Sequence, residues 1–293
     1  MKKTFLTLFI AAATGLWSPA ADFTRADAMI SSPQNYKECR ALLKTMLPSA
    51  GRAEDKACVL WRLSRIQLLI GETEGTKEAK AQAFEEGRQY AEQAIGECPS
   101  IHESYMWHCA NVGRACQLKP LLEQASAVPV MTRDLTTIID GLARTECSEA
   151  WQALAEIYYN HPFKSTDSAI NFTRKALSCI PEGELRLSSY AFFAKMLLER
   201  GASADKRAKA IEKNAAQFSK SHSSAIDKFA FYDGSSDAAR PAWSEVPISA
   251  LTDEREAEAV LKYAADLYRK AAAATPTDKA DFETIKEMLS KIK

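Results

Sequence analysis

The sequence contains little glycine or proline, and neither sign of charge is in excess. Of its 293 residues, 11 are glycine and 11 are proline, while 38 basic residues are balanced by 38 acidic ones. A nucleic-acid-binding surface needs a concentration of basic side chains, and no block of like charges occurs here, so the composition argues against a nucleic-acid partner. With few helix-interrupting residues and abundant alanine, leucine, glutamate and lysine, the composition is typical of an all-α protein.

Long hydrophobic runs are missing after residue 20. The apolar run at residues 4–17 follows Lys2 and Lys3 and precedes Ser18-Pro19-Ala20. A basic start, a short apolar run and a small-residue end are typical of a cleavable signal peptide, and the run is short for a membrane span. We therefore expect residues 1–20 to be a signal peptide and the mature protein to be periplasmic, with an uncleaved anchor as the alternative.

Motifs for catalysis and cofactor binding are missing as well. The sequence has no glycine-rich phosphate loop, no Cys-x-x-Cys, no His-Glu-x-x-His and no Gly-x-Ser-x-Gly. His102, Cys109 and Cys116 recur every seven residues on one helix face, which is either a soft-metal site or a narrow seam of small residues between helices. We favour the seam, and we expect a protein that is not an enzyme and holds no cofactor or metal.

The seven cysteines all lie after residue 20. An exported protein meets an oxidising environment, and an odd number leaves at least one cysteine without an intramolecular partner. Cys39 and Cys58 lie at nearly equal distances from the turn at 48–51, so an antiparallel hairpin would bring them level. This predicts a Cys39–Cys58 disulfide; the alternative is that the cysteines pack as small apolar residues where helices cross.

One spacing occurs three times: a small residue, an alanine seven positions later, and a proline five positions after that. The three sets are Gly87/Ala94/Pro99, Ala169/Ala176/Pro181 and Ala264/Ala271/Pro276. In a helical hairpin, the small residues let the second helix pack closely against the first, and the proline then ends it. The spacing predicts a right-handed solenoid of antiparallel helical hairpins.

Trp61, Trp107 and Trp151 mark the first helices of successive hairpins, at intervals of 46 and 44 residues. We expect a flexible leader at 21–34 and one helical repeat domain over 35–293. Apolar periodicity predicts the helices of that domain at 35–47, 52–70, 77–98, 103–118, 132–145, 151–158, 167–179, 184–200, 204–217 and 254–274, followed by a closing helix. The stretch 219–251 has no clear periodicity and is predicted to be a long irregular insertion.

The unit that begins at Trp151 resembles a tetratricopeptide repeat (TPR), with Leu154, Ala155 and Tyr158 on its first helix and the second of the spacings above on its second helix. The segment 87–113 is more particular. It is similar to the TPR-like proteins of two groups: the T component of tripartite ATP-independent periplasmic (TRAP) transporters and the regulators of microtubule dynamics. Resemblance to the T component implies a periplasmic protein that associates with itself and with a solute-binding protein, and that offers a groove or pore to small apolar ligands.

Candidate binding residues are taken from the first helices, which line the concave wall of such a solenoid, and from the insertion. They are Tyr105, Asn111, Arg114, Tyr159, Asn160, Phe193 and Trp243. The alternative is that the aromatic members belong to the core and that Trp243 packs over its own domain. We expect an exported, non-catalytic scaffold that holds a segment of a cell-envelope protein on its concave face. The alternative is the T-component-like protein described above, as a homo-oligomer with a small apolar ligand or a solute-binding partner.

Overall fold

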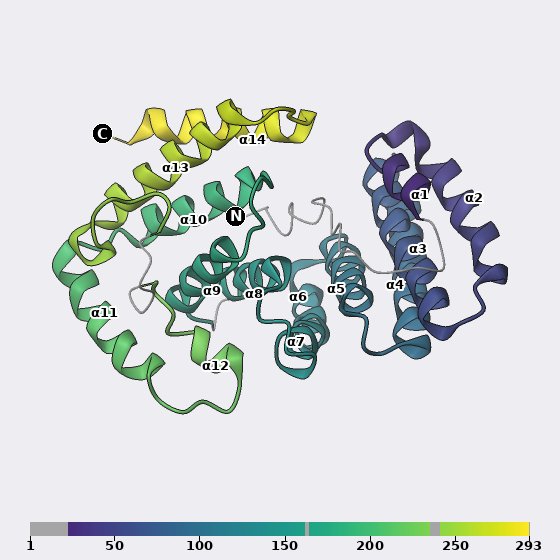
Figure 1. The fold of residues 1–293 in the computed structure, drawn as a ribbon, viewed down its shortest axis with the longest axis horizontal. Coiled ribbons are helices and arrows are strands. Elements are labelled where there is room, and N and C mark those ends of the chain that lie inside the picture. The colour runs from purple at the N-terminus through teal and green to yellow at the C-terminus, as the bar shows by residue number, and fades with distance from the viewer. Residues whose placement is uncertain (1–22, 162–163, 235–240, 293) are drawn as a thin grey trace. The chain divides into compact units, whose positions relative to one another are not determined.

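The computed structural model describes residues 23–161, 164–234 and 241–292, and in these ranges it contains helices and loops but no β-strand. The chain divides into two compact units, an N-terminal unit (Met1–Arg144) and a C-terminal unit (Thr145–Lys293). Within each unit, helices pack against neighbouring helices (Figure 1). The prediction of an all-α, solenoid-like fold is therefore confirmed.

The N-terminal unit is a row of neighbouring helices. Its helical elements are α1 (Thr24–Met29), η1 (Pro33–Asn35), α2 (Tyr36–Met46), η2 (Leu47–Ser49), α3 (Ala53–Thr73), α4 (Lys77–Glu97), α5 (His102–Gln117), α6 (Leu121–Gln124), η3 (Ala125–Ala127), α7 (Val128–Thr136) and η4 (Thr137–Gly141). Helix α3 packs on both α2 and α4, α4 packs on α5, and α5 packs on α7. Trp61 on α3 and Trp107 on α5 are buried, as expected for residues that mark successive hairpins.

The close approach of α4 and α5 depends on a glycine. A Cβ atom added to Gly87 would lie 2.2 Å from the Oδ1 atom of Asn111 on α5. Ala94, seven residues further along α4, is completely buried. Helix α4 then ends shortly before Pro99. The first occurrence of the repeated spacing thus has the packing role that the sequence predicts.

The described part of the predicted flexible leader is folded, which corrects the prediction for residues 21–34. Phe23 and Ala26 are buried around α1. Asp27 pairs with Arg62 of α3 at an N–O distance of 3.0 Å, and the Arg62 guanidinium lies 3.8 Å from the centroid of the Phe23 ring. Arg62 of α3 therefore contacts both the Phe23 ring and the Asp27 carboxylate, and this segment packs as part of the N-terminal unit.

The predicted signal peptide, residues 1–20, lies outside the described residues. Among the helices that the structure does describe, none combines the length and the apolar character needed to cross a membrane. Export therefore stays a prediction.

The C-terminal unit begins with a hairpin that has an aromatic core. Its elements are α8 (Ser148–Asn160), α9 (Thr166–Ser178), α10 (Leu187–Arg200), α11 (Ala204–Phe218), α12 (Ala225–Phe229), η5 (Ile248–Ala250), α13 (Asp253–Lys270) and α14 (Pro276–Lys291). Helices α8 and α9 pack along each other, and Trp151 stacks on Phe172 with ring centroids 5.6 Å apart. Ala169 and Ala176 are buried on α9, which ends before Pro181. The second occurrence of the spacing also packs as predicted.

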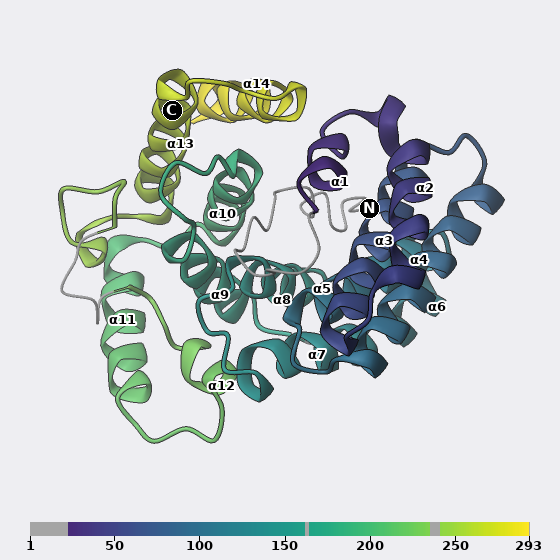
Figure 2. The same cartoon turned by 45° about the vertical axis from the view of Figure 1, so that its right-hand side comes forward.

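The packing partner of α10 is α13, not the helix that follows α10 in the sequence. The sequence predicts that 184–200 and 204–217 form a pair, but α11 packs mainly on η5 and α12, and Arg207 is its buried residue. Helix α13 buries an apolar face, including Val260, in the core that it shares with α10. The irregular insertion at 219–251 is confirmed in its described part, and α11 belongs to the same excursion between α10 and α13 (Figure 1, Figure 2).

The third occurrence of the spacing has a different structure from the first two. Helix α13 ends at Lys270, so Ala271 follows the helix instead of packing within it. Pro276 is the first residue of α14, where a proline costs no intrahelical hydrogen bond. The Thr275 hydroxyl accepts from the backbone N–H of Asp278, and the Asp278 carboxylate accepts from the backbone N–H of Thr275. Here the proline begins a helix.

Candidate functional site

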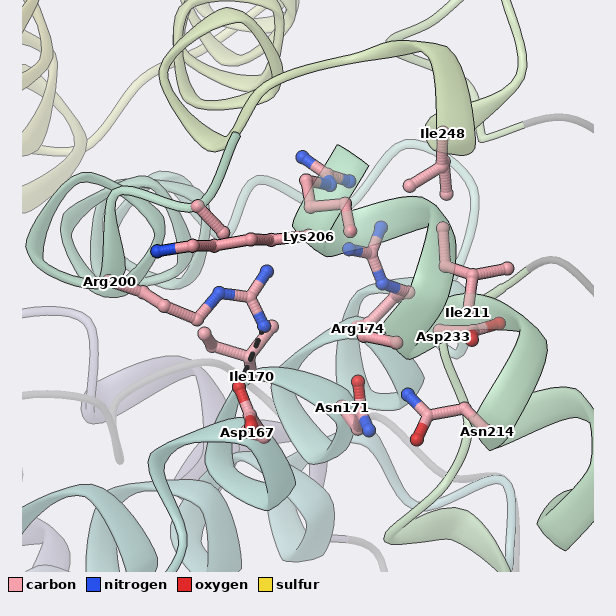
Figure 3. Close-up of a pocket in the computed structure, with 13 residues that line it drawn as sticks. Asp167, Ile170, Asn171, Arg174, Arg200, Lys206, Ile211, Asn214, Asp233 and Ile248 are labelled. Carbon is pink, nitrogen blue, oxygen red and sulfur yellow. Dashed lines mark hydrogen bonds and ion pairs between the residues drawn. The ribbon is translucent and has the colours of Figure 1, made fainter. Parts of the chain in front are cut away.

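A polar cleft of about 180 Å³ lies between α9 and α11 in the C-terminal unit. One wall is a face of α9, the other is a face of α11, and the end of α10 and parts of the insertion complete it (Figure 3). The lining residues are Asp167, Ile170, Asn171, Arg174, Arg200, Ala202, Lys206, Arg207, Ala210, Ile211, Asn214, Asp233 and Ile248. We take this cleft as the candidate functional site because it gathers basic and amide side chains from several segments of the chain.

Helical periodicity places these side chains on facing surfaces. The α9 residues run from Asp167 to Arg174 at positions i, i+3, i+4 and i+7, which lie on one helix face. The α11 residues run from Lys206 to Asn214 with a similar period. The two helices therefore border the cleft with faces that carry both polar and apolar side chains.

A buried ion network forms the back of the cleft. Glu256 on α13 is completely buried and accepts from Arg174 Nη1 at 2.5 Å and Nη2 at 3.1 Å. Arg207 Nη2 donates to the same carboxylate at 2.6 Å. Burial alone would raise the pKa of Glu256, but the two guanidinium groups outweigh it and lower this pKa to about 2. Glu256 thus holds α9, α11 and α13 together as a charged group.

A second ion pair fixes the end of α10. Arg200 donates to both oxygens of the buried Asp253 at 2.8 Å, and to Asp167 at 2.9 Å. Burial lowers the pKa of Arg200, but these carboxylates outweigh it and raise the pKa above its usual range. Asp253 also accepts from the backbone N–H of Ala202 at 2.8 Å. The start of α13 is therefore bonded to the loop that leads into α11.

Several polar groups of the cleft keep hydrogen-bonding capacity. No carboxylate of the described residues pairs with the Lys206 ammonium, and the buried Nε of Arg174 has no hydrogen-bond partner. Asn171 donates from Nδ2 to the backbone oxygen of Ala230 at 2.8 Å, which leaves its amide oxygen as an acceptor. The arrangement can bind an acidic group through its cations and a peptide group through its amides. In the described ranges, no cluster of three His, Cys, Asp or Glu residues is arranged to hold a metal ion.

The predicted site residues of the N-terminal unit make their contacts within that unit. Asn111 is completely buried and donates from Nδ2 to Ser64 Oγ at 3.0 Å and to the backbone oxygen of Trp107 at 2.9 Å. Arg114 Nε lies 2.7 Å from Glu72 Oε1, which joins α5 to α3. These contacts correct the prediction of Asn111 as a surface binding residue, because its amide bridges α3 and α5 in the core.

Tyr105, also on α5, is half-buried. Burial raises the pKa of its phenol, and the Asp134 carboxylate on α7 raises it further. Tyr105 therefore lies close to a charged residue of the neighbouring helix and does not join the cleft of the C-terminal unit.

The predicted residues of the C-terminal unit divide between surface and core. Tyr159 is half-buried, and its hydroxyl donates to Glu199 on α10 at 2.5 Å. Asn160 ends α8 and donates to the backbone oxygen of Glu156 at 2.8 Å. Phe193 is completely buried, which corrects its prediction as a binding residue. All three lie outside the cleft.

Trp243 packs over its own unit, as in the alternative interpretation of the sequence. Its ring centroid lies 5.9 Å from that of Phe193 and 6.4 Å from that of Tyr190. Its Nε1 donates to Glu256 Oε1 at 3.2 Å. Trp243 is therefore a structural cover for the buried ion network and not a lining residue of the cleft.

Cys39 and Cys58 are not bonded to each other, in contrast to the predicted disulfide. The Cys39 thiol points toward α1 and donates to the backbone oxygen of Ala26 at 3.3 Å. Burial raises the pKa of Cys39 to about 11, so little of the reactive thiolate forms at neutral pH. All seven cysteines lie in the described ranges as thiols.

Arg174, Arg207 and Glu256 are not among the candidate binding residues that the sequence predicts. The signal for Arg174 was present, because it lies between Ile170 and Leu177 on the face of α9 that periodicity assigns to the core. A charge at such a position needs a buried partner. Its partner Glu256 lies 82 residues away, a separation that periodicity cannot bridge.

Comparison with protein families gives a match over residues 22–132, to the family described as regulator of microtubule dynamics protein 1-3. The matched part is less than half of the chain and lies within the N-terminal unit. The match and the all-helical fold both fit the helical repeat group. Comparison with curated proteins finds no match.

Proposed function

We propose that this chain is a non-catalytic binding protein that holds a polypeptide segment of a partner in the cleft between α9 and α11. The observation that carries the proposal is the lining of that cleft, in which cationic and amide side chains with spare hydrogen-bonding capacity sit on a frame of buried ion pairs. A rigid frame loses little conformational entropy on binding, so modest contacts suffice for affinity.

The chemistry of the lining favours a segment with an acidic side chain. Lys206 and Arg200 supply positive charge at one side of the cleft, and a ligand carboxylate would compete there with Asp167, whose side chain is 70% exposed. Asn171 and Asn214 offer amide groups that match a peptide backbone. The proposed segment is therefore a peptide whose acidic side chain lies near Lys206.

The proposed binding surface differs from the one that the sequence predicts. The sequence favoured the concave wall formed by first helices, whereas the cleft is bordered by α9, the second helix of its hairpin. We retain from that hypothesis a TPR-like arrangement of hairpins and an exported, periplasmic protein. The support for export is the pattern of residues 1–20.

A second candidate function is that of a T-component-like protein of a TRAP transporter. The segment that carries this resemblance, 87–113, falls within the part of the chain that matches the related family of regulators of microtubule dynamics. Neighbouring genes for a periplasmic solute-binding protein and a membrane permease would support this candidate. Purification as a monomer, with no binding to such a solute-binding protein, would contradict it.

Photo-crosslinking in the native cell tests the proposed function. A photo-crosslinking amino acid replaces Ala210, which is exposed and lines the cleft; the matched control replaces Ala216, which is exposed on α11 but does not line it. We expect a defined polypeptide to crosslink from position 210 only, and Lys206→Glu to abolish the crosslink. Equal crosslinking from both positions, or none from 210, would contradict a partner in the cleft.

A further inference from the structure

The N-terminal unit contains a second cavity, a groove of about 330 Å³ along α5. Helix α5 is its floor, and α4 and α7 are its walls, since α5 packs on both. The floor residues His108, Val112 and Ala115 recur on one face of α5. At a rise of about 1.5 Å per residue, His108 and Ala115 are about 10 Å apart along the helix, and Lys119 follows the end of α5. The groove therefore has two separate ends.

The middle of the groove is apolar. Val112 and Ala115 on α5 face Ala127 and Val130 from the opposite wall. Charged and polar side chains lie at both ends of this apolar middle. A cavity of this volume that combines an apolar surface with polar groups can hold a small molecule. The apolar part would contact a hydrocarbon body, and the polar groups would select its head group.

The polar end is built on a buried histidine. His108 is 4% exposed and its partner Asp134 on α7 is 2% exposed. His108 Nδ1 lies 2.6 Å from Asp134 Oδ2. Since an ionised carboxylate only accepts hydrogen bonds, Nδ1 carries a proton and donates it to Asp134. In the neutral ring, Nε2 is then left as an acceptor.

His108 lines the groove, and its Nε2 atom is buried without a hydrogen-bond partner among the described residues. Glu92 Oε1 on α4, which accepts from Arg88, lies 3.6 Å from Nε2, which is too far for a hydrogen bond. With a neutral ring, two acceptors therefore lie side by side. A group with two or three N–H donors, placed beside both atoms, would satisfy them together.

The charges around this end also favour a cation. Glu85 and Glu92 share a single guanidinium, that of Arg88 on the same helix. At the His108 end, Asp134 is a second carboxylate beside Glu92, and Arg133, 3.9 Å from Asp134, has a side chain that is 71% exposed. Glu85 lies toward Lys119, at the far end of the groove. The His108 end therefore holds two carboxylates whose cationic partners are either shared with Glu85 or exposed to water.

We propose that the α4–α5–α7 groove binds a small amphipathic primary amine, with its ammonium group donating to His108 Nε2 and Glu92 and its apolar body on Val112 and Ala115. A carboxylate head group is disfavoured, because it would bring acceptors to face Glu92 and the Nε2 lone pair. This inference goes beyond the proposed function, since it concerns a different unit and a different class of ligand.

Titration with matched six-carbon probes tests the proposal on the full chain. Hexylamine, 1-hexanol and hexanoate are added at neutral pH while the ring resonances of His108 are followed by NMR. We expect hexylamine to bind about tenfold more tightly than either other probe, with a shift at Nε2. Tighter binding of hexanoate, no binding of hexylamine, or a doubly protonated His108 ring in the free protein would each overturn the proposal.

Two glutamates on α4 provide the matched variants. Glu92→Gln removes the carboxylate beside Nε2 at a residue whose side chain is 50% exposed, so the fold is expected to survive. Glu97→Gln makes the same change at an exposed residue outside the groove. We expect Glu92→Gln to weaken hexylamine binding about tenfold and Glu97→Gln to leave it unchanged. Equal affinities of the two variants would overturn the assignment of the head group.

Discussion

The two units differ in how charged residues contribute to their packing. In the N-terminal unit, α3, α4 and α5 follow one another through short turns and pack mainly through apolar and small side chains, such as Gly87, while the Arg114–Glu72 pair that joins α5 to α3 is partly exposed. In the C-terminal unit, α10 and α13 pack together although α11, α12 and the insertion separate them. There, the buried Arg174, Arg207 and Glu256 join three helices.

The difference follows the length of the connection between packed helices. A short turn brings its two helices together, so shape complementarity is enough to fix their packing. A long excursion has many other conformations available, and a buried ion network that is satisfied in one arrangement favours that arrangement. The N-terminal unit repeats this pattern on a small scale: where α6 and η3 separate α5 from α7, the buried His108–Asp134 pair joins the two helices.

The largest expected effect comes from breaking the ion network. Glu256→Gln leaves the buried Arg174 guanidinium without a counter-charge and Arg207 with Asp253 alone, and we expect a loss of about 3–5 kcal/mol in the free energy of unfolding of the C-terminal unit. Urea denaturation, read out by hydrogen exchange in α9 and α13, measures it. The matched control is Glu258→Gln on the same helix, which breaks a surface pair with Lys262 and is expected to cost less than about 1 kcal/mol. Equal effects would show that the network does not hold the unit together.

Acid should destabilise the C-terminal unit, as Glu256→Gln does. The pKa of Glu256 is lowered to about 2 in the folded state, against about 4.3 in an unfolded chain. Its contribution to stability is complete above the unfolded pKa and is lost as the pH falls toward the folded pKa, by an amount on the order of 3 kcal/mol. We expect hydrogen exchange in α9 and α13 to accelerate below about pH 4, and Glu256→Gln to remove that dependence. An unchanged acid response in the variant would assign the effect to other carboxylates.

The smallest of the three effects tests packing in the N-terminal unit with a pair of glycines on α4. Gly87→Ala places a methyl group against Asn111 and is expected to destabilise that unit by about 1–3 kcal/mol. Gly96→Ala, where an added Cβ would meet nothing within 4 Å, should stabilise it by about 0.5–1 kcal/mol through helix propensity. Thermal or urea unfolding measures both changes. Changes of the same sign would argue that close packing of α4 on α5 contributes little.

Much of the fold could be predicted because its signals are local. Apolar periodicity located helices such as α3 and α4, and the small-residue spacing identified the packing faces around Gly87 and Ala169. The third spacing misled because proline both ends helices and begins them, and the capping pair of Thr275 and Asp278 decided between the two at Pro276.

The candidate site was far less predictable than the fold. Asn111 and Phe193 have residue types that occur in binding surfaces, yet both are core residues here. Periodicity says that a residue lies on a certain face of its helix but not which other helix covers that face. The cleft depends on such coverage, since α11 faces α9 across it instead of packing against α10.

The sequence by itself therefore determined the all-helical class, most helix positions and the hairpins joined by short turns, because these depend on contacts between residues close together in the chain. Only the tertiary structure decided that α13 pairs with α10, that Arg174, Arg207 and Glu256 meet, and that His108 presents an unpaired nitrogen to a groove. These features depend on contacts between distant segments, and their free energy is gained only after the intervening chain has been ordered.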